Sequence, residues 1–270
     1  MIDQSERDLY SIRIERLHML IKQLSQGNGS FRTFLYPKTR NDNQVFYSGE
    51  ALLALAFILN QKRDEETIDW IRKSKKYYLN YYHSNNRNTA FIPWHTMAYW
   101  EMFNLTGDQS YRESIFELND WLICLQDLGS ETPMQIKGRF YLEALSQNGP
   151  PHASSTAVYV EGLSYAYNMA KSVGDDARSE AYLMAIRWGL RSLLQLQYRK
   201  VNSYYLQKRG RVLGGLRTTL TNNIMRIDNT QHSIMASLAA QRFLSPEDYS
   251  RKLPLATDHH KRMCSPFLSK

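Results

Sequence analysis

Residues 48–66 of the chain read SGEALLALAFILNQKRDEE, and this stretch sets the pattern for the whole sequence. Residues 51–59 are apolar on every side, which is typical of a helix that is buried all round. A short polar turn and an acidic segment follow, and the free backbone N–H groups at a helix start favour negative charge. The stretch therefore predicts an inner helix, a tight turn and an outer helix that starts at residues 63–66.

The same order recurs three more times along the chain. Further acidic helix starts follow short turns at residues 106–109, 173–176 and 245–248. Helices rich in apolar or small residues precede them at residues 93–105, 153–170 and 229–243. Small residues allow close helix packing, so we interpret these segments as inner helices and the acidic-start segments as outer helices.

Longer loops with strand-like pieces follow the outer helices, at residues 24–32, 124–141 and 194–217. Because short turns and long loops alternate, we expect all the long loops at one end of the assembly. Alternating inner and outer antiparallel helices close into an α/α toroid. We therefore expect an all-α fold, a toroid of about four helix pairs with short β-hairpin-like loops at one end, as a single domain over residues 1–270. An irregular helical bundle is the alternative.

Composition sets limits on the partners. The chain has 270 residues, of which 43% are hydrophobic, and this excludes wholesale disorder. Its net charge of +8 favours anionic partners, although a charge that serves only solubility explains it equally well. The basic residues are scattered, apart from a short cluster at residues 259–262, and no nucleic-acid-binding motif accompanies them. We expect no nucleic-acid partner.

The sequence also predicts a location in the cell. The N-terminus lacks the apolar segment of a secretory signal, and the longest apolar run, residues 51–59, is far shorter than the roughly 20 residues of a membrane span. The two cysteines, Cys124 and Cys264, fit a reducing compartment and are too few for a cysteine-rich zinc site. We therefore expect a soluble, cytoplasmic protein without a membrane partner.

Several segments together resemble the α/α-toroid superfamily. They are the loops at residues 24–31 and 196–216, SGEAL at residues 48–52 and TAVYVEGL at residues 156–163. The superfamily includes many glycoside hydrolases, polysaccharide lyases, N-acylglucosamine 2-epimerases and the C-terminal domain of glucuronyl C5-epimerase. The resemblance spans nearly the whole chain and implies a carbohydrate as substrate. Members with six helix pairs have about twelve helices, so this chain resembles a reduced toroid.

The inner helices should all begin at the long-loop end, where their N–H groups and dipoles attract anions. Polar residues gather at these four helix starts, and three of the seven histidines are among them. They are Tyr47, Ser48 and Glu50; Trp94 and His95; His152, Ser154, Ser155 and Thr156; and Asp228, Asn229, Gln231 and His232. We therefore place the functional site at this end.

Five residues are candidates for catalysis. Asp228 precedes His232 by four residues, so both share a helix face on which the carboxylate could orient or charge the imidazole. Glu161 lies in a helix of small and aromatic residues, where a carboxylate must be paired or face a wet cavity. With Glu50 and His95, these residues form the predicted catalytic set. Each of these residues could instead have a purely structural role. The alternatives are helix capping for Ser48, Ser154 and Asp228, core packing for His95, loop packing for His152, and a structural hydrogen bond for Glu161.

Other residues are candidates for binding the substrate. Aromatic rings can stack on sugar faces, and arginines can pair with a carboxylate through two hydrogen bonds. The candidates are Tyr36, Tyr47, Trp94, His152, Tyr159, Arg217 and Arg226. The three clustered histidines and Asp228 have the ligand types for zinc but no diagnostic spacing, so we predict no metal and no cofactor.

These features predict a carbohydrate-active enzyme that binds a small-molecule or oligosaccharide ligand, expected to be an anionic uronate, at the mouth of the toroid. Hydrolysis would need two carboxyl groups with separated pKa values. Epimerisation or elimination would need a base and an acid across the C5–H bond, with cations to stabilise the developing charge. The alternative is a toroid that binds a saccharide or peptide without turnover, because fold does not imply function.

Overall fold

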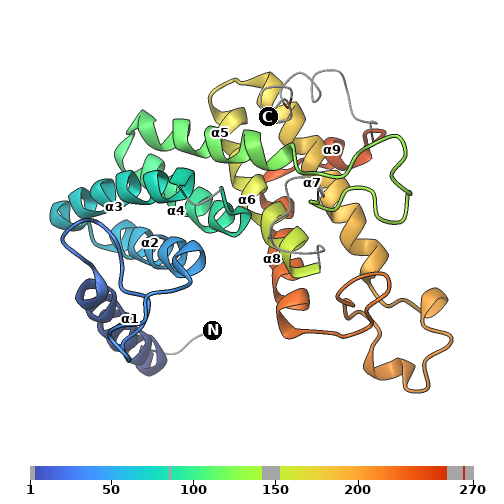
Figure 1. Cartoon of the computed structure of the whole chain (residues 1–270), viewed down its shortest axis with the longest axis horizontal. Coiled ribbons are helices and arrows are strands. Elements are labelled where there is room, and N and C mark those ends of the chain that lie inside the picture. Colours follow the sequence, from blue (N-terminus) through green and yellow to red (C-terminus); the bar gives the residue numbers. More distant parts are fainter. Residues whose placement is uncertain (1–3, 85–86, 142–152, 254–263, 265–270) are drawn as a thin grey trace. The chain divides into compact units, whose positions relative to one another are not determined.

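The structure is a computed structural model, and it describes residues 4–84, 87–141, 153–253 and 264. In these ranges the chain is all-helical, as predicted, and its β-structure is confined to isolated bridges. None of the helices described is both long and apolar enough to span a bilayer. The α-helices, labelled in Figure 1, are α1 Gln4–Leu24, α2 Gln44–Gln61, α3 Glu65–Ser84, α4 Ile92–Thr106, α5 Gln109–Ile123, α6 Ala153–Ser172, α7 Asp176–Leu196, α8 Ile227–Phe243 and α9 Pro246–Ser250.

The chain divides into two compact units, which we call the N-terminal unit (residues 1–108) and the C-terminal unit (residues 109–270). The N-terminal unit holds α1 to α4, and the C-terminal unit holds α5 to α9. Each unit is described by itself. The expectation of one domain over residues 1–270 stays a prediction.

In the N-terminal unit, the predicted inner helices α2 and α4 run parallel. Near their starts, Ser48 Oγ lies 3.4 Å from His95 Nε2. Further along both helices, Asn60 Nδ2 donates a hydrogen bond to Glu101 Oε2 at 2.7 Å. The two contacts therefore advance along both helices in the same direction, as expected of two inner helices joined through an outer one.

In the C-terminal unit, α6 and α8 pack along each other and also run parallel. Glu161 approaches His232 near the start of α8, and the rings of Tyr165 and Phe243 meet further along, with their centroids 5.0 Å apart. The small residues predicted for an inner helix let α6 sink into the core, and most of its side chains are buried. Helix α7 packs one buried face against α6.

The predicted acidic helix starts are confirmed as caps at three places. Asp64 accepts from the Thr67 N–H, Asp175 accepts from the Arg178 N–H, and Ser245 accepts from the Asp248 N–H. These bonds satisfy backbone donors that have no partner within the helix. The turns that precede α3, α7 and α9 are thus fixed by local sequence.

The three long loops share one device. An antiparallel bridge closes each of them, between Ser25 and Phe31, Gln126 and Phe140, and Gln197 and Leu216. Two residues before the bridged residue, Gly29 and Gly138 adopt φ values of +94° and +99°. A Cβ atom on Gly29 would lie 2.8 Å from the Lys73 carbonyl oxygen of α3, and one on Gly138 would meet the Trp188 carbonyl oxygen of α7. Glycine therefore lets the first two of these loops pack on the backbone of the next outer helix.

The cysteine expectation is corrected by the structure. Cys124, just after α5, forms a disulfide with Cys264, and their Cα atoms lie 5.3 Å apart. Disulfides persist in oxidising compartments and are rare in the cytosol. The reading of the two cysteines as residues of a reducing compartment is therefore wrong, and cytoplasmic localisation stays a prediction without their support.

Candidate active site

The loop before α8 anchors the starts of both α6 and α8. The Thr218 carbonyl oxygen accepts from the Ala153 N–H at 2.9 Å. The hydroxyl oxygen of the same threonine accepts from Asn229 Nδ2 at 3.2 Å. Two inner helices of the C-terminal unit therefore begin side by side, and the positive ends of both helix dipoles lie at this place.

Glu161 of α6 and His232 of α8 form a carboxylate–imidazole pair. Glu161 Oε2 lies 3.9 Å from His232 Nδ1, and the two side chains are 5% and 18% exposed. A buried carboxylate is costly unless it is paired, and the imidazole of His232 faces this one. The carboxylate holds one edge of the imidazole while the ring keeps part of its surface open. An imidazole base and its orienting acid have this arrangement, which is often loose without substrate.

Some of the buried side-chain atoms without a hydrogen-bond partner lie on the same two helices, and others lie elsewhere in the described chain. Among the residues described, Glu161 Oε2, Asn229 Oδ1 and Ser233 Oγ have no such partner. Asn229 and Ser233 lie one turn apart on the buried face of α8, which continues through Ala236. In native proteins about nine-tenths of buried polar groups have a partner in protein or ordered water. We therefore expect a ligand or water to complete this cluster, which we call the α6–α8 site.

Asp228 does not take the orienting role that its spacing to His232 suggested. Its carboxylate accepts two hydrogen bonds from the Arg226 guanidinium, at 2.9 and 2.7 Å. The pairing with Arg226 lowers the pKa of Asp228 below its ordinary value, against the opposing effect of burial. Asp228 also lies inside the first turn of α8, beyond the capping position. In the structure Glu161, from the neighbouring helix, faces the imidazole.

The other predicted residues of the C-terminal unit have structural contacts. Tyr159 is buried, with its ring 5.4 Å from that of Phe140. Arg217 donates to the Gln195 carbonyl oxygen at 3.2 Å. His152 lies outside the described residues.

The remaining candidates belong to the N-terminal unit. His95 is fully buried, stacks on Phe91 at 3.5 Å between centroids, and its Nδ1 lies 2.8 Å from the Phe91 carbonyl oxygen. Burial lowers the pKa of His95 to about 3, so this imidazole is neutral and part of the core. Ser48 donates to the Gln44 carbonyl oxygen from within α2 and does not cap it.

The acidic and aromatic candidates of this unit lie nearer its surface. Glu50, Tyr36 and Tyr47 are exposed, and Trp94 is half-buried. Of the five predicted catalytic residues, the structure thus brings Glu161 and His232 into direct contact.

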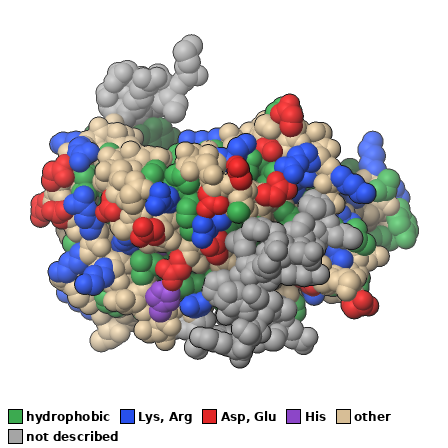
Figure 2. All heavy atoms as spheres, turned by 90° about the horizontal axis from the view of Figure 1, so that it is seen from above, with side chains coloured by type: hydrophobic (Ala, Val, Ile, Leu, Met, Phe, Trp, Pro, Cys, Tyr) green, Lys and Arg blue, Asp and Glu red, His purple; other side chains and the backbone are tan. Residues whose placement is uncertain are grey.

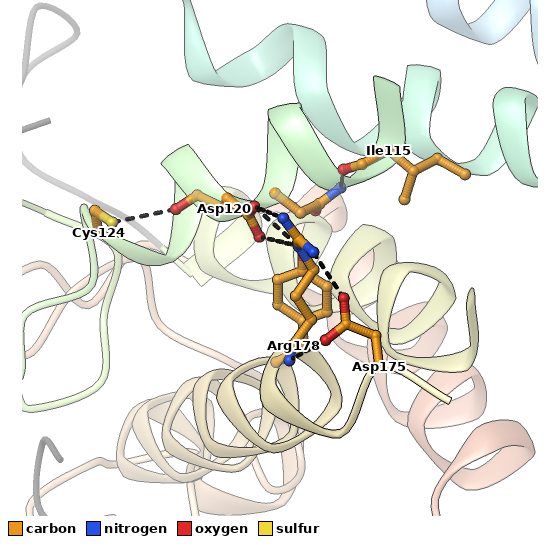
Figure 3. A network of polar contacts seen from close by, with 7 residues as sticks. Ile115, Asp120, Cys124, Asp175 and Arg178 are labelled. Carbon is orange, nitrogen blue, oxygen red and sulfur yellow. Dashed lines mark hydrogen bonds and ion pairs between the residues drawn. The ribbon is translucent and has the colours of Figure 1, made fainter. Parts of the chain in front are cut away.

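A surface cavity of about 570 Å³ lies elsewhere in the C-terminal unit, between α5 and the turn from α6 to α7. Figure 3 shows its central network: Arg178 donates to Asp120 at 3.0 Å and to Asp175 at 2.6 Å. Tyr182 donates a hydrogen bond to Asp120 at 2.5 Å. Burial is the main cause that raises the pKa of Tyr182, and the charge of the Asp120 carboxylate is the second. The charges of Arg178 and Asp120 therefore neutralise each other, and we interpret the network as structural.

Charge is spread over the surface. On the face drawn in Figure 2, lysine and arginine side chains alternate with aspartate and glutamate. Within the described part of the chain, no group of three or more His, Cys, Asp or Glu side chains is placed to hold a metal ion. The excess positive charge is thus not gathered into one patch on this face.

Asn229 and Ser233 were missed as site residues by sequence reasoning. Asn229 stood in the polar cluster at the helix start, but nothing separated it from Asp228 beside it. The available signal was the helical spacing of Asn229, Ser233 and Ala236, which marks the buried face of α8. Asp228 lies off that face.

Comparison with known proteins does not identify a protein family for this chain. No family model matches the chain, and neither a curated protein nor a solved structure is significantly similar to it. The function has to be argued from the site.

Proposed function

We propose that the chain is a carbohydrate-active enzyme with an α/α-toroid architecture that transfers a proton on an anionic sugar at the α6–α8 site. Support for the toroid comes from the repeated elements. Inner helices run parallel in each unit, short turns alternate with long loops, and the loops are closed by equivalent bridges. These are the local features that a ring of helix pairs requires.

The contact between Glu161 and His232 carries the proposal for the chemistry. Hydrolysis would need two carboxyl groups at one centre, and in the C-terminal unit the candidate Asp228 is engaged by Arg226. A carboxylate–imidazole pair fits the removal of a weakly acidic C–H proton, where an imidazole base is held and charged by an acid. Among the three reactions, epimerisation and elimination are therefore favoured over hydrolysis.

In this mechanism His232 takes the C5 proton of a uronate residue, and Glu161 stabilises the imidazolium that forms. In elimination, the electrons of the C5–H bond form a C4–C5 double bond, and the C4 oxygen leaves and takes a proton from solvent. In epimerisation, C5 takes a proton from solvent on its opposite face, and His232 releases the first proton to solvent. The starts of α6 and α8 favour the negative charge of the sugar carboxylate and of the intermediate.

The test is turnover of a panel of glucuronate- and galacturonate-containing oligosaccharides by the full chain. Elimination is followed by the ultraviolet absorbance of the unsaturated product, epimerisation by deuterium uptake at C5, and hydrolysis by new reducing ends. Glu161→Gln and His232→Gln should each lower turnover at least about a hundredfold. Matched controls, Glu180→Gln on the exposed face of α7 and His83→Gln at the end of α3, should retain it.

Other results would contradict the proposal. Turnover that survives both site substitutions would place the chemistry elsewhere. New reducing ends with neither the ultraviolet absorbance of an unsaturated product nor deuterium uptake at C5 would mean hydrolysis. Binding of these saccharides without any turnover would favour the alternative, a toroid that binds a saccharide without turnover, over the enzyme.

A further inference from the structure

The amide of Asn229 has a counterpart in the N-terminal unit. Gln44, the first residue of α2, donates from Nε2 to the Phe31 carbonyl oxygen at 2.8 Å. Asn229 of α8 donates from Nδ2 to the Leu216 carbonyl oxygen at 3.5 Å. Phe31 and Leu216 are the bridged residues of their loops. Each amide therefore ties an inner helix to the bridge of the loop before it.

The oxygen atoms of the two amides differ in their partners. Gln44 Oε1 accepts from the Tyr78 hydroxyl of α3 at 2.6 Å. The same hydroxyl oxygen accepts from the Phe31 N–H at 2.8 Å, so this amide is saturated by the protein. Asn229 is fully buried too, yet its Oδ1 has no hydrogen-bond partner in the described part of the chain.

The orientation of the Asn229 amide is fixed by its nitrogen. Nδ2 faces two acceptors, the Leu216 carbonyl oxygen and Thr218 Oγ1. A flipped amide would turn its oxygen toward the carbonyl oxygen and lose that bond. The orphaned atom is therefore the oxygen, an acceptor that requires a donor.

We propose that Asn229 Oδ1 accepts a hydrogen bond from a hydroxyl group of the bound sugar, as Gln44 Oε1 does from the hydroxyl of Tyr78. The inference rests on the proposed function in that a sugar occupies the α6–α8 site. It adds the residue that recognises a hydroxyl beside the proton-transferring pair. His232 lies three residues further along α8 and is partly exposed, so the proposal has the sugar enter from the imidazole side.

Ser233 extends the same subsite. Its hydroxyl is buried without a hydrogen-bond partner among the described residues, one turn beyond Asn229. A hydroxyl group can both donate and accept, so Ser233 can bind the next hydroxyl of the sugar in either sense. The class of ligand is therefore a polyhydroxylated ring, with donors on the side that faces α8.

The test is isothermal titration of the full chain with D-glucuronate, D-galacturonate and D-glucose, and with the monodeoxy analogues of each. Wild-type protein should bind one deoxy analogue about tenfold more weakly than its parent sugar. Asn229→Ala should bind the parent about tenfold more weakly and should no longer distinguish it from that analogue. The matched control Gln44→Ala should keep the wild-type affinities while its melting temperature falls, because it removes a saturated structural amide.

Three results would overturn the inference. They are wild-type affinity in Asn229→Ala, equal affinity for all deoxy analogues in wild-type protein, and no binding of any of these sugars. The deoxy series on wild-type protein decides the question if the alanine variant does not fold. If the affinity pattern holds while no turnover is detected, the hydroxyl subsite stands and the proposed catalysis fails. If turnover is detected while Asn229→Ala leaves the sugar affinities unchanged, the proposed catalysis stands and the hydroxyl subsite fails.

Discussion

Two histidines occupy the first two turns of inner helices, His95 in α4 of the N-terminal unit and His232 in α8 of the C-terminal unit. The first is sealed between Phe91 and Ser48, and its pKa falls to about 3 because it is fully buried. The second faces the carboxylate of Glu161 and keeps part of its ring exposed. A histidine near the start of a helix is thus part of the core in one unit and keeps a partly exposed ring beside a carboxylate in the other.

The amides at the helix starts repeat this contrast. In the N-terminal unit, Tyr78 saturates Gln44 with its hydroxyl, and the loop, the inner helix and the outer helix are locked together. In the C-terminal unit, the oxygen of Asn229 is left over within the described residues. Buried polar groups without partners cost stability, and the Oε1 atom of Gln126 in the same unit is also left without a partner.

The largest expected effect concerns covalent stabilisation, which the structure places in the C-terminal unit through Cys124 and Cys264. Cross-linking residues 140 positions apart restricts the unfolded chain, so Cys124→Ser should destabilise this unit by about 4 kcal/mol. Hydrogen exchange should accelerate in α5 and α7 and stay unchanged in α2 and α4. Equal acceleration in all four helices would show that the two units unfold together.

The next effect tests the saturated amide of the N-terminal unit. Tyr78→Phe removes the hydroxyl and strands both Gln44 Oε1 and the Phe31 N–H in the core. We expect a loss of about 2 kcal/mol in the free energy of unfolding, measured by chemical denaturation. Tyr77→Phe, next to it and half-buried, is the control and should be nearly neutral. Equal effects of the two substitutions would mean that the hydrogen bonds of the Tyr78 hydroxyl with Gln44 and Phe31 do not stabilise the unit.

A smaller effect follows from the pKa of His95. Its folded value is about 3, whereas an unfolded histidine titrates near 6.5. Between these values the unfolded state binds more protons, so stability is lost as the pH falls below about 6.5, by about 1 kcal/mol per pH unit. His95→Gln should flatten this slope in denaturation curves taken at successive pH values. The exposed His83→Gln should not, and a slope that is the same in all three proteins would contradict the assignment.

The smallest effect is expected at the ion pair of Arg226 and Asp228, at the start of α8. Both side chains reach solvent, and pairs of this kind often contribute nothing measurable. Asp228→Asn should therefore leave the melting temperature unchanged. A clear fall in the melting temperature would mean that the first turn of α8 depends on this pair. Asp228 would then contribute to stability, contrary to this prediction.

Much of the fold could be predicted from the sequence. The helices expected at residues 48–60 and 229–243 are confirmed as α2 and α8, with ends shifted by four residues or fewer. Ile234, Met235 and Leu238 of α8 are exposed, so the inner position of this helix stays a prediction. The acidic helix starts are also confirmed, because a cap is a contact between residues three positions apart. The strand-like pieces in the loops are confirmed as single bridges, since glycine and the bridged residue stand close in sequence.

The candidate site could be predicted only in part. Glu161 was singled out because a carboxylate in a helix of small and aromatic residues must be paired or face a wet cavity, and His232 because Asp228 precedes it by four residues. Their mutual contact was not foreseen, because they are 71 positions apart and meet only through the packing of α6 on α8. The same limit hid the partner of Cys124, which lies 140 residues away.

Local order and the polar character of the helix starts are thus written in the periodicity of the chain, because neighbouring residues create them. Which polar residue contacts which is not written in this periodicity. The sequence indicates Asp228 as the partner of His232, but the packing of α6 beside α8 places Glu161 there, and Asp228 pairs with Arg226. Contacts between distant segments depend on how helices pack in three dimensions, and that information lies in no single stretch of residues.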